Sequence, residues 1–252
     1  MTLEPVHFST LKHMQRSPAH YRYEADHRRE KQEAYELGGS ALHSFLLGGK
    51  DVVRYEARRA GKEWQAFREA HPDCIILNAK EHDKAAGMRD SIERHRQATE
   101  LLQGTRERTM QWRWLGRLIE GTQDVFTLEH LTELKTGRTA HPERFMSAAK
   151  FYGYHAQLAW YRRGLIESGF GTPASAWIVA VESAPPYPVT VFRMTDNALE
   201  LGERMCRAWL ERLLVCESSD QWPAYVESAV PFDIQEDSGF TLTIDGEETE
   251  VD

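Results

Sequence analysis

The segment "IEGTQDVFTLEHLTELKTG", residues 119–137, places charged side chains on two apolar runs that look like neighbouring strands. Asp124 stands at the start of the first run, and the triple Glu133-Leu-Lys135 ends the second. Charged groups on a half-buried strand cost free energy unless they are paired or bind a metal. If the two runs pair as a hairpin, Asp124 and Glu133 converge across it. Lys135, two residues further on, then shares a face with Glu133.

This arrangement is typical of a divalent-metal site. Two carboxylates with open positions suit a hard cation, above all Mg²⁺. A neighbouring lysine can orient or deprotonate a water, or stabilise charge on a phosphate, so the three side chains fit metal-assisted phosphodiester hydrolysis. Taken alone, however, a Glu-x-Lys triple is common, and these residues favour a solvated strand face that carries a surface ion pair.

The composition is that of an ordinary globular protein, with 252 residues, 41% hydrophobic and 28% charged. No apolar run reaches membrane-spanning length and no signal-peptide layout is present, so we expect a cytoplasmic protein without a membrane partner. Three widely separated cysteines argue against a disulfide framework or an iron–sulfur cluster. The formal net charge is -8. It does not favour nucleic-acid binding, although a local basic lining can coexist with an acidic exterior.

The order of expected elements predicts an α/β (α+β) fold, a small mixed sheet clasped by helices. We expect a single domain over residues 1–233, with a helical N-terminal part over 1–105 and a core over 106–218. An acidic tail follows over 234–252, either a disordered solubilising end or a docking segment. The expected helices are 10–23, capped by Ser9 and bent or interrupted at Pro18, then 32–47, 62–71, 79–102, 141–169 and 195–216, and the expected strands are 107–116, 118–128, 130–136, 175–183 and 187–194.

Other polar side chains have the spacing of a site. His43 follows a Gly-Gly pair by one helical turn and is either a metal ligand or an ordinary satisfied histidine. Gln157 and Tyr161 share a helix face, and Lys150 and Tyr154 lie on the same stripe, which is either a polar outer face or a surface for a nucleic-acid backbone. Trp112 and Trp114 alternate along a predicted strand, where core packing is favoured over base stacking.

The motifs "GSALH", "EGTQDVF", "TELKTG" and "YGYHAQLAWYRRGL", in this order, resemble the PD-(D/E)XK nuclease superfamily. The chain looks most like the RecE-type exonucleases (exodeoxyribonuclease VIII) of phages and prophages, over roughly residues 8–215. The resemblance implies a restriction-endonuclease-like core over 106–218. One departure stands before the aspartate, where Gly121-Thr122-Gln123 lacks the usual proline and basic residue.

The resemblance also implies roles for individual residues. Lys135 would be the catalytic lysine, and Gln157 and Tyr161 would help to orient DNA and the active site. The implied metal ligands are Asp124, Glu133, the backbone carbonyl of Leu134, His43 and, for a second metal, Glu107. The basic residues that would line a DNA-facing surface are Arg22, Arg28, Arg29, Arg138, Arg144, Lys150, Arg162 and Arg163, of which Arg138, Lys150 and Arg162 join Gln157 and Tyr161 as the expected DNA contacts.

The function implied by the resemblance is a Mg²⁺-dependent exonuclease on linear double-stranded DNA, with Mn²⁺ able to substitute. It would act in the 5′-to-3′ direction and leave 3′ single-stranded overhangs for a single-strand annealing protein. A homo-oligomeric ring, a trimer or tetramer, would enclose the DNA. The alternatives are an endonuclease or single-strand nuclease with the same core, and a non-catalytic DNA-binding module.

Overall fold

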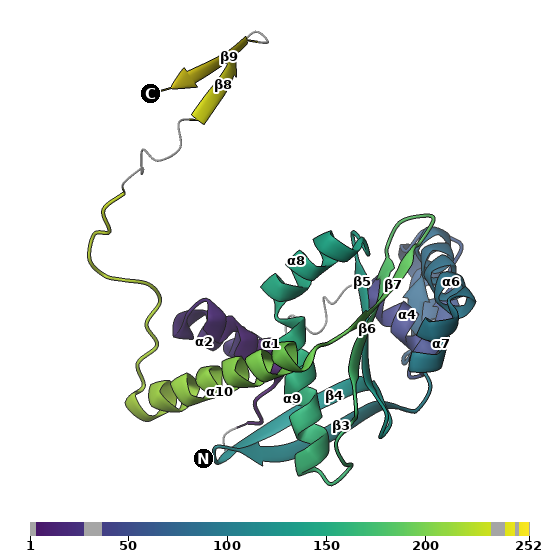
Figure 1. Ribbon diagram of the computed structural model, residues 1–252. Coiled ribbons are helices and arrows are strands. Elements are labelled where there is room, and N and C mark those ends of the chain that lie inside the picture. Colours follow the sequence, from purple (N-terminus) through teal and green to yellow (C-terminus); the bar gives the residue numbers. More distant parts are fainter. Residues whose placement is uncertain (1–3, 28–36, 233–239, 245–246, 252) are drawn as a thin grey trace.

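The computed structural model describes residues 4–27, 37–232, 240–244 and 247–251, and its centre is a five-stranded mixed sheet (Figure 1). The strand order is β3-β4-β5-β6-β7, and only β5 and β6 run parallel. A parallel pair needs a long crossover, which the helices between β5 and β6 provide. The strands are β3 (Thr105–Trp114), β4 (Arg117–Phe126), β5 (Leu131–Gly137), β6 (Ala176–Glu182) and β7 (Val189–Arg193).

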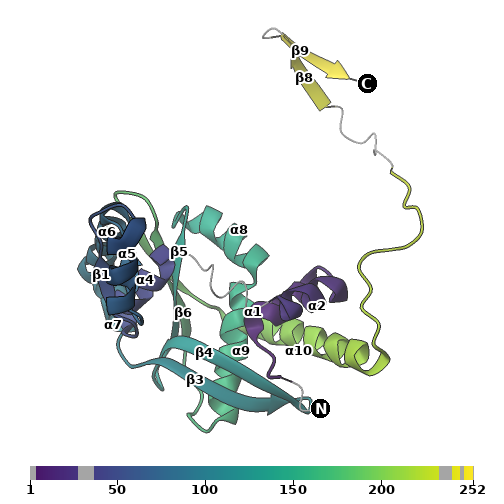
Figure 2. The same ribbon diagram turned by 180° about the vertical axis from the view of Figure 1, so that it is seen from behind.

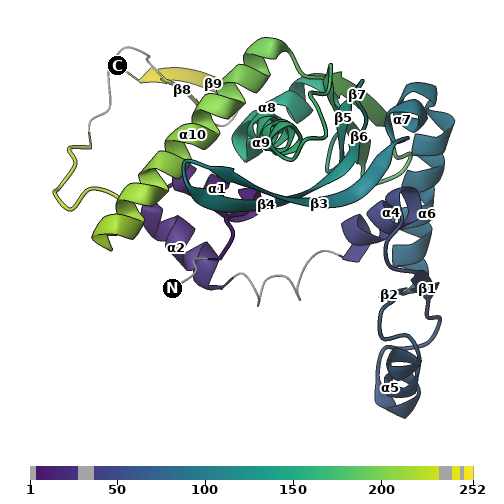
Figure 3. The same ribbon diagram turned by 90° about the horizontal axis from the view of Figure 1, so that it is seen from below.

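Helices cover both faces of this sheet, as Figure 3 shows. On one face α9 packs against β3, β4 and β5, with α10 behind it; α4, α6 and α7 cover the other face. The alternation in β3 has the expected cause, because Met110, Trp112 and Trp114 are buried against α9. The helices are α1 (Phe8–Leu11), the short 3-10 helix η1 (Lys12–Gln15), α2 (Pro18–Asp26), α4 (Leu37–Leu47), α5 (Gly61–Ala70), α6 (Ala79–Arg94), α7 (Arg96–Leu101), α8 (Pro142–Tyr152), α9 (Tyr154–Glu167) and α10 (Asp196–Ser219).

Three expected helices have different boundaries. The helix predicted over 141–169 is broken at Gly153, whose left-handed conformation (φ +73°) ends α8 before α9 begins. The helix predicted over 79–102 is broken at His95, whose side chain accepts a hydrogen bond from the Ala98 N–H. The helix predicted over 10–23 with Ser9 as its cap is interrupted before Pro18. Ser9 lies inside α1, and α2, which begins at Pro18, is capped by Ser17. Residues 32–36 of the predicted helix over 32–47 lie outside the described residues.

Some elements were not expected from the sequence. Two short parallel strands, β1 (Val52–Arg54) and β2 (Ile75–Leu77), flank α5, which projects away from the large sheet (Figure 3). The acidic tail contains an antiparallel hairpin of β8 (Phe240–Ile244) and β9 (Glu247–Val251), so a wholly disordered end is not what the structure shows. Figure 2 shows this hairpin standing apart from the sheet.

The division into one domain and a tail stays a prediction.

Within the described ranges, the helices are all too short or too polar to cross a membrane.

Candidate active site

Strands β4 and β5 separate at the point where the two carboxylates stand. Their ladder consists of the pairs Val125–Thr132 and Phe126–Leu131. In the same register Asp124 and Glu133 would come next. Instead, Asp124 Oδ2 accepts a hydrogen bond from the Leu134 N–H at 2.7 Å, and Glu133 Oε1 accepts one from the Asp124 N–H at 3.4 Å. The carboxylates thus satisfy backbone donors that the opened ladder leaves free.

Glu133 and Lys135 lie on the same face, as predicted. Lys135 Nζ is 2.8 Å from Glu133 Oε2, and Glu133 is only 2% exposed. Lys135 Nζ also lies 5.2 Å from the centroid of the Tyr154 ring, within the range of a cation–π contact. The lysine is therefore held between a carboxylate and an aromatic ring.

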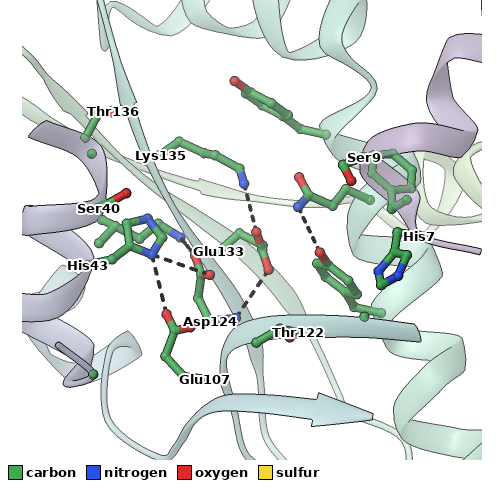
Figure 4. Close-up of a pocket in the computed structure, with 18 of the residues that line it drawn as sticks. His7, Ser9, Ser40, His43, Glu107, Thr122, Asp124, Glu133, Lys135 and Thr136 are labelled. Carbon is green, nitrogen blue, oxygen red and sulfur yellow. Dashed lines mark hydrogen bonds and ion pairs between the residues drawn. The ribbon is translucent and has the colours of Figure 1, made fainter. Parts of the chain in front are cut away.

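A second group of ligand atoms forms beside this pair, from three different elements (Figure 4). His43 on α4 places Nδ1 3.6 Å from Glu107 Oε1 on β3 and 3.7 Å from Asp124 Oδ1 on β4. One ligand atom from each residue lies within 4.8 Å of the others. An imidazole and two carboxylates at this spacing fit a divalent cation.

The backbone at Glu107 departs from regular strand geometry. Its φ is +47°, a left-handed value that is unusual for a residue other than glycine. The β3–β4 ladder pairs Arg106 with Val125 and Arg108 with Gln123, but it omits the pair Glu107–Asp124 between them. Such conformations cost about 1–3 kcal/mol and gather at functional sites. Two facing carboxylates add repulsion, which a bound cation would remove.

The pKa values of the site residues are those expected where negative charge is buried. Burial raises the pKa of Glu133 to about 7, with the charge of Asp124 adding to this effect and Lys135 opposing it. Burial also raises the pKa of Asp124 against the charges of His43 and Lys135. For His43 burial lowers the pKa, but the contacts with Glu107 and Asp124 outweigh it and the net pKa is raised. A divalent cation would favour the ionised carboxylates.

Lys135 keeps its positive charge in this setting. Burial acts to lower its pKa, but the charges of Glu133 and Asp124 are stronger, and the pKa lies above that of an ordinary lysine. In the metal-free protein the side chain is a hydrogen-bond donor and a fixed cation rather than a base. It can therefore orient a water or stabilise negative charge on a phosphate.

These groups line one open cavity of about 780 Å³. The implied ligands His43, Glu107, Asp124 and Glu133 line it, and so do Gln157 and Tyr161 of α9. Gln157 Nε2 donates to Tyr161 Oη at 3.3 Å, as the four-residue spacing predicted. Leu134 lines the cavity with its neighbours, while its role as a carbonyl ligand stays a prediction.

The cavity also contains polar residues that the sequence analysis missed. Figure 4 shows His7 and Ser9 across the cavity from Ser40 and His43. The other polar additions include Lys12, Ser44, Lys50, Glu120, Thr122, Thr136 and Tyr152. Glu120 and Thr122 lie four and two residues before Asp124 and share its face of β4, so the period of two could have found them. Lys12, Ser44 and Lys50 have no spacing in the sequence that links them to Asp124. The family resemblance covers the chain from about residue 8, but it implied no site role for Ser9 or Lys12.

Several predicted DNA contacts lie elsewhere. Lys150 is exposed on α8 and does not line the cavity, because the break at Gly153 ends the stripe that was expected to continue to Gln157. Arg138 is exposed just beyond β5, and Arg162 lines a separate hollow with Glu200 and Glu203 of α10. Contact of these three with DNA stays a prediction. Arg28 and Arg29 lie outside the described residues.

Gln123, the departure from the family pattern, is fully buried and does not line the cavity. Its side-chain nitrogen and oxygen have no hydrogen-bond partner in the described part of the chain. Gln123, at the position of the usual proline, therefore takes no functional group out of the cavity, whereas Thr122, at the position of the usual basic residue, lines it without a charge.

Comparisons with known proteins agree with this fold. The crystal structure of a protein from Eubacterium rectale, whose name assigns it as a candidate exonuclease, superposes with a TM-score of 0.62 at 15% identity, over 92% of this chain and 91% of that one. The structure of SSO0001 gives a TM-score of 0.31 at 11% identity, over 73% of this chain and 85% of that one, which carries no argument. The search among curated proteins gave no match.

A family model described as "PDDEXK-like domain of unknown function (DUF3799)" matches residues 7–232. This match spans the sheet, both helical layers and every residue of the candidate site. The resemblance to the PD-(D/E)XK superfamily is confirmed, whereas the RecE-type branch stays a prediction. The chain belongs to the DUF3799 family of PDDEXK-like domains.

Proposed function

We propose that the protein is a divalent-metal-dependent deoxyribonuclease that degrades linear double-stranded DNA from its ends. The observation that carries this proposal is the meeting of Asp124, Glu133 and Lys135 with His43 and Glu107 in one open cavity. A surface ion pair does not explain this grouping of charged residues, because Asp124 and Glu133 are buried and their pKa values are raised.

The metal would be held by His43, Glu107 and Asp124, joined by Glu133 and the carbonyl of Leu134. When bound, it supplies a positive charge that polarises the phosphate and acidifies a water. Mg²⁺ is the expected ion, and the imidazole of His43 makes Mn²⁺ a good substitute.

Side chains of the protein position the lysine and bind the substrate strand. Glu133 holds Lys135 in place through their 2.8 Å contact. Lys135 then donates to the attacking water or to the phosphate on which negative charge develops. Gln157 and Tyr161, hydrogen-bonded to one another, present polar atoms to the strand that enters the cavity. Lys12 and Lys50 add positive charge at its walls, which supports a polyanionic substrate.

The finer parts of the proposal are the direction and the partners. We infer degradation of one strand in the 5′-to-3′ direction, so that a 3′ overhang remains for an annealing protein. A homo-oligomeric ring around the duplex would give processivity. The family resemblance and the name of the Eubacterium rectale protein support end-directed cleavage.

The test uses linear duplexes labelled at the 5′ or the 3′ end and a closed circular duplex, each with Mg²⁺ or with EDTA. We expect Mg²⁺-dependent release of label from the 5′ end first and an intact circle. Lys135→Ala and Glu133→Ala should strongly reduce release of label, and substitution of an exposed lysine on α6, Lys84→Ala, should leave it unchanged. Cutting of the circle would indicate an endonuclease. No Mg²⁺-dependent product from any substrate would contradict the nuclease proposal.

A further inference from the structure

Two aromatic side chains are exposed at the end of α8. Phe151 is 71% exposed and Tyr152 is 51% exposed, and they are the last two residues before Gly153. Their rings meet edge to face, with centroids 5.3 Å apart and an interplanar angle of 79°. Adjacent aromatic rings left in water in this way are typical of a binding surface.

These rings continue into the candidate active site. Tyr152 lines the same cavity as Lys135. It also stacks on Tyr154, with centroids 5.9 Å apart and an interplanar angle of 24°. Tyr154 in turn contacts Lys135 Nζ at 5.2 Å. An unbroken line of rings therefore runs from the surface of α8 to the catalytic lysine.

The backbone holds the two rings at a defined position. The Gly153 N–H donates to the Lys150 carbonyl at 3.3 Å and closes the last turn of α8. Gln15 Nε2 of η1 donates to the Phe151 carbonyl at 3.5 Å. The rings thus stand on a terminated helix end that is tied to the N-terminal segment.

The size and surroundings of the pair favour a nucleobase over a protein partner. Two aromatic rings bury about 150–250 Å² each, well below the roughly 800 Å² per partner of a stable protein interface. The cavity beside them holds Lys12, Lys50 and Lys135, whose charges suit the phosphates that follow a base. A flat ring next to a cationic groove is how proteins bind unpaired strands.

We propose that Phe151 and Tyr152 form a stacking platform for an unpaired base of the strand that enters the cavity. This inference rests on the proposed nuclease function and narrows its substrate to a strand whose end is separated from its complement. The last bases are held on α8, and the backbone behind them runs past Lys135.

The first test measures binding without cleavage. A short fluorescent single-stranded DNA is titrated with the full chain in EDTA and followed by anisotropy. Phe151→Ala and Tyr152→Ala should each weaken binding about tenfold, the loss expected for one stacked base. Phe151→Trp and Tyr152→Phe should keep it. Phe232→Ala, which removes a ring that is 92% exposed and does not line the cavity, is the matched control and should bind as the wild type does.

The second test asks whether the bases are what the rings recognise. An oligonucleotide with abasic end positions should bind the wild type and both alanine variants equally. A 2-aminopurine at the terminal position should be quenched by the wild type and not by Tyr152→Ala. Two results would refute the platform. In the first, the alanine variants have the same affinity for intact DNA as the wild type. In the second, the variants remain folded by circular dichroism but lose affinity for intact and abasic DNA to the same extent. Altered oligomeric state with unchanged DNA affinity would make the rings a protein interface instead.

The outcome for the platform is separate from that for the nuclease. Binding in EDTA involves no hydrolysis. If the wild type cleaves DNA but shows no base stacking, the platform is rejected and the nuclease proposal stands. Stacking in a protein that cleaves no substrate would keep the platform and reject the nuclease.

Discussion

The buried carboxylate of Glu133 makes the metal-free protein less stable as the pH rises. Its pKa is about 7 in the folded protein, because burial and the charge of Asp124 disfavour the ionised form, against an ordinary value of 4.5. A group with a raised pKa contributes stability at low pH and loses it as the pH rises through its folded value. About 2.5 pH units at 1.36 kcal/mol each correspond to about 3 kcal/mol, lost between about pH 4.5 and pH 8.

Glu133→Gln isolates this effect, since the amide has the shape of the neutral acid and does not ionise. Other groups titrate in the same range, so the informative quantity is the difference in unfolding free energy between wild type and variant. We expect this difference to shift by about 3 kcal/mol in favour of the variant between about pH 4.5 and pH 8. Urea unfolding in EDTA, followed by tryptophan fluorescence at several pH values, measures it.

A difference that stays constant over this range would show that Glu133 titrates normally and is not held in a buried, negatively charged site. A shift in the opposite direction would mean that Lys135 stabilises the ionised carboxylate more strongly than burial opposes it. Addition of Mg²⁺ should reduce the shift, because the cation binds the ionised form.

Further predictions concern the cavity, the packing and the tail. Lys135→Ala should lower Mg²⁺-dependent cleavage by about 10²- to 10⁴-fold and leave the circular dichroism spectrum unchanged; residual activity close to wild type would remove Lys135 from the mechanism. His43→Ala should weaken Mn²⁺ binding at least about tenfold in calorimetry without DNA, and equal affinity would take the imidazole out of the ligand set. Gly202→Ala should destabilise the protein by about 1–2 kcal/mol, seen as a lower melting temperature, because the new Cβ would stand 2.5 Å from the His155 carbonyl oxygen and the cost of overpacking exceeds the gain in helix propensity. Deletion of residues 234–252 should leave the melting temperature within about 1 °C of wild type, since the hairpin stands apart from the sheet; a clear drop would show that it docks on the body.

Much of the local structure was predictable because local rules decide it. Alternation placed Trp112 and Trp114 on the buried face of β3, and Thr195, the first residue of the helix predicted over 195–216, caps α10. The period of two along β5 placed Glu133 beside Lys135. These features depend on neighbours within a few residues, so the sequence carries them directly.

Breaks within helical patterns were harder to predict. Gly153 lies in a continuous amphipathic pattern, and glycine is tolerated inside helices as well as at their ends. Its αL conformation depends on the packing of α8 and α9 against different neighbours. The break leaves Phe151 and Tyr152 exposed, with Tyr152 lining the cavity, and it removes Lys150 from the Gln157 stripe, a consequence that periodicity does not reveal.

By itself, the sequence determined the α/β class, the strand that carries Glu133 and Lys135, and the helix face that carries Gln157 and Tyr161. The family resemblance named His43 and Glu107 as ligands, but only the tertiary structure showed that both meet Asp124 and that β4 and β5 part at the carboxylates. It also showed that His7 and Ser9 lie across the cavity from His43. The reason is physical. Periodicity records which face of an element is buried, whereas the meeting of residues from α1, α4, β3 and β4 depends on how whole elements pack, and no spacing along the chain encodes that distance.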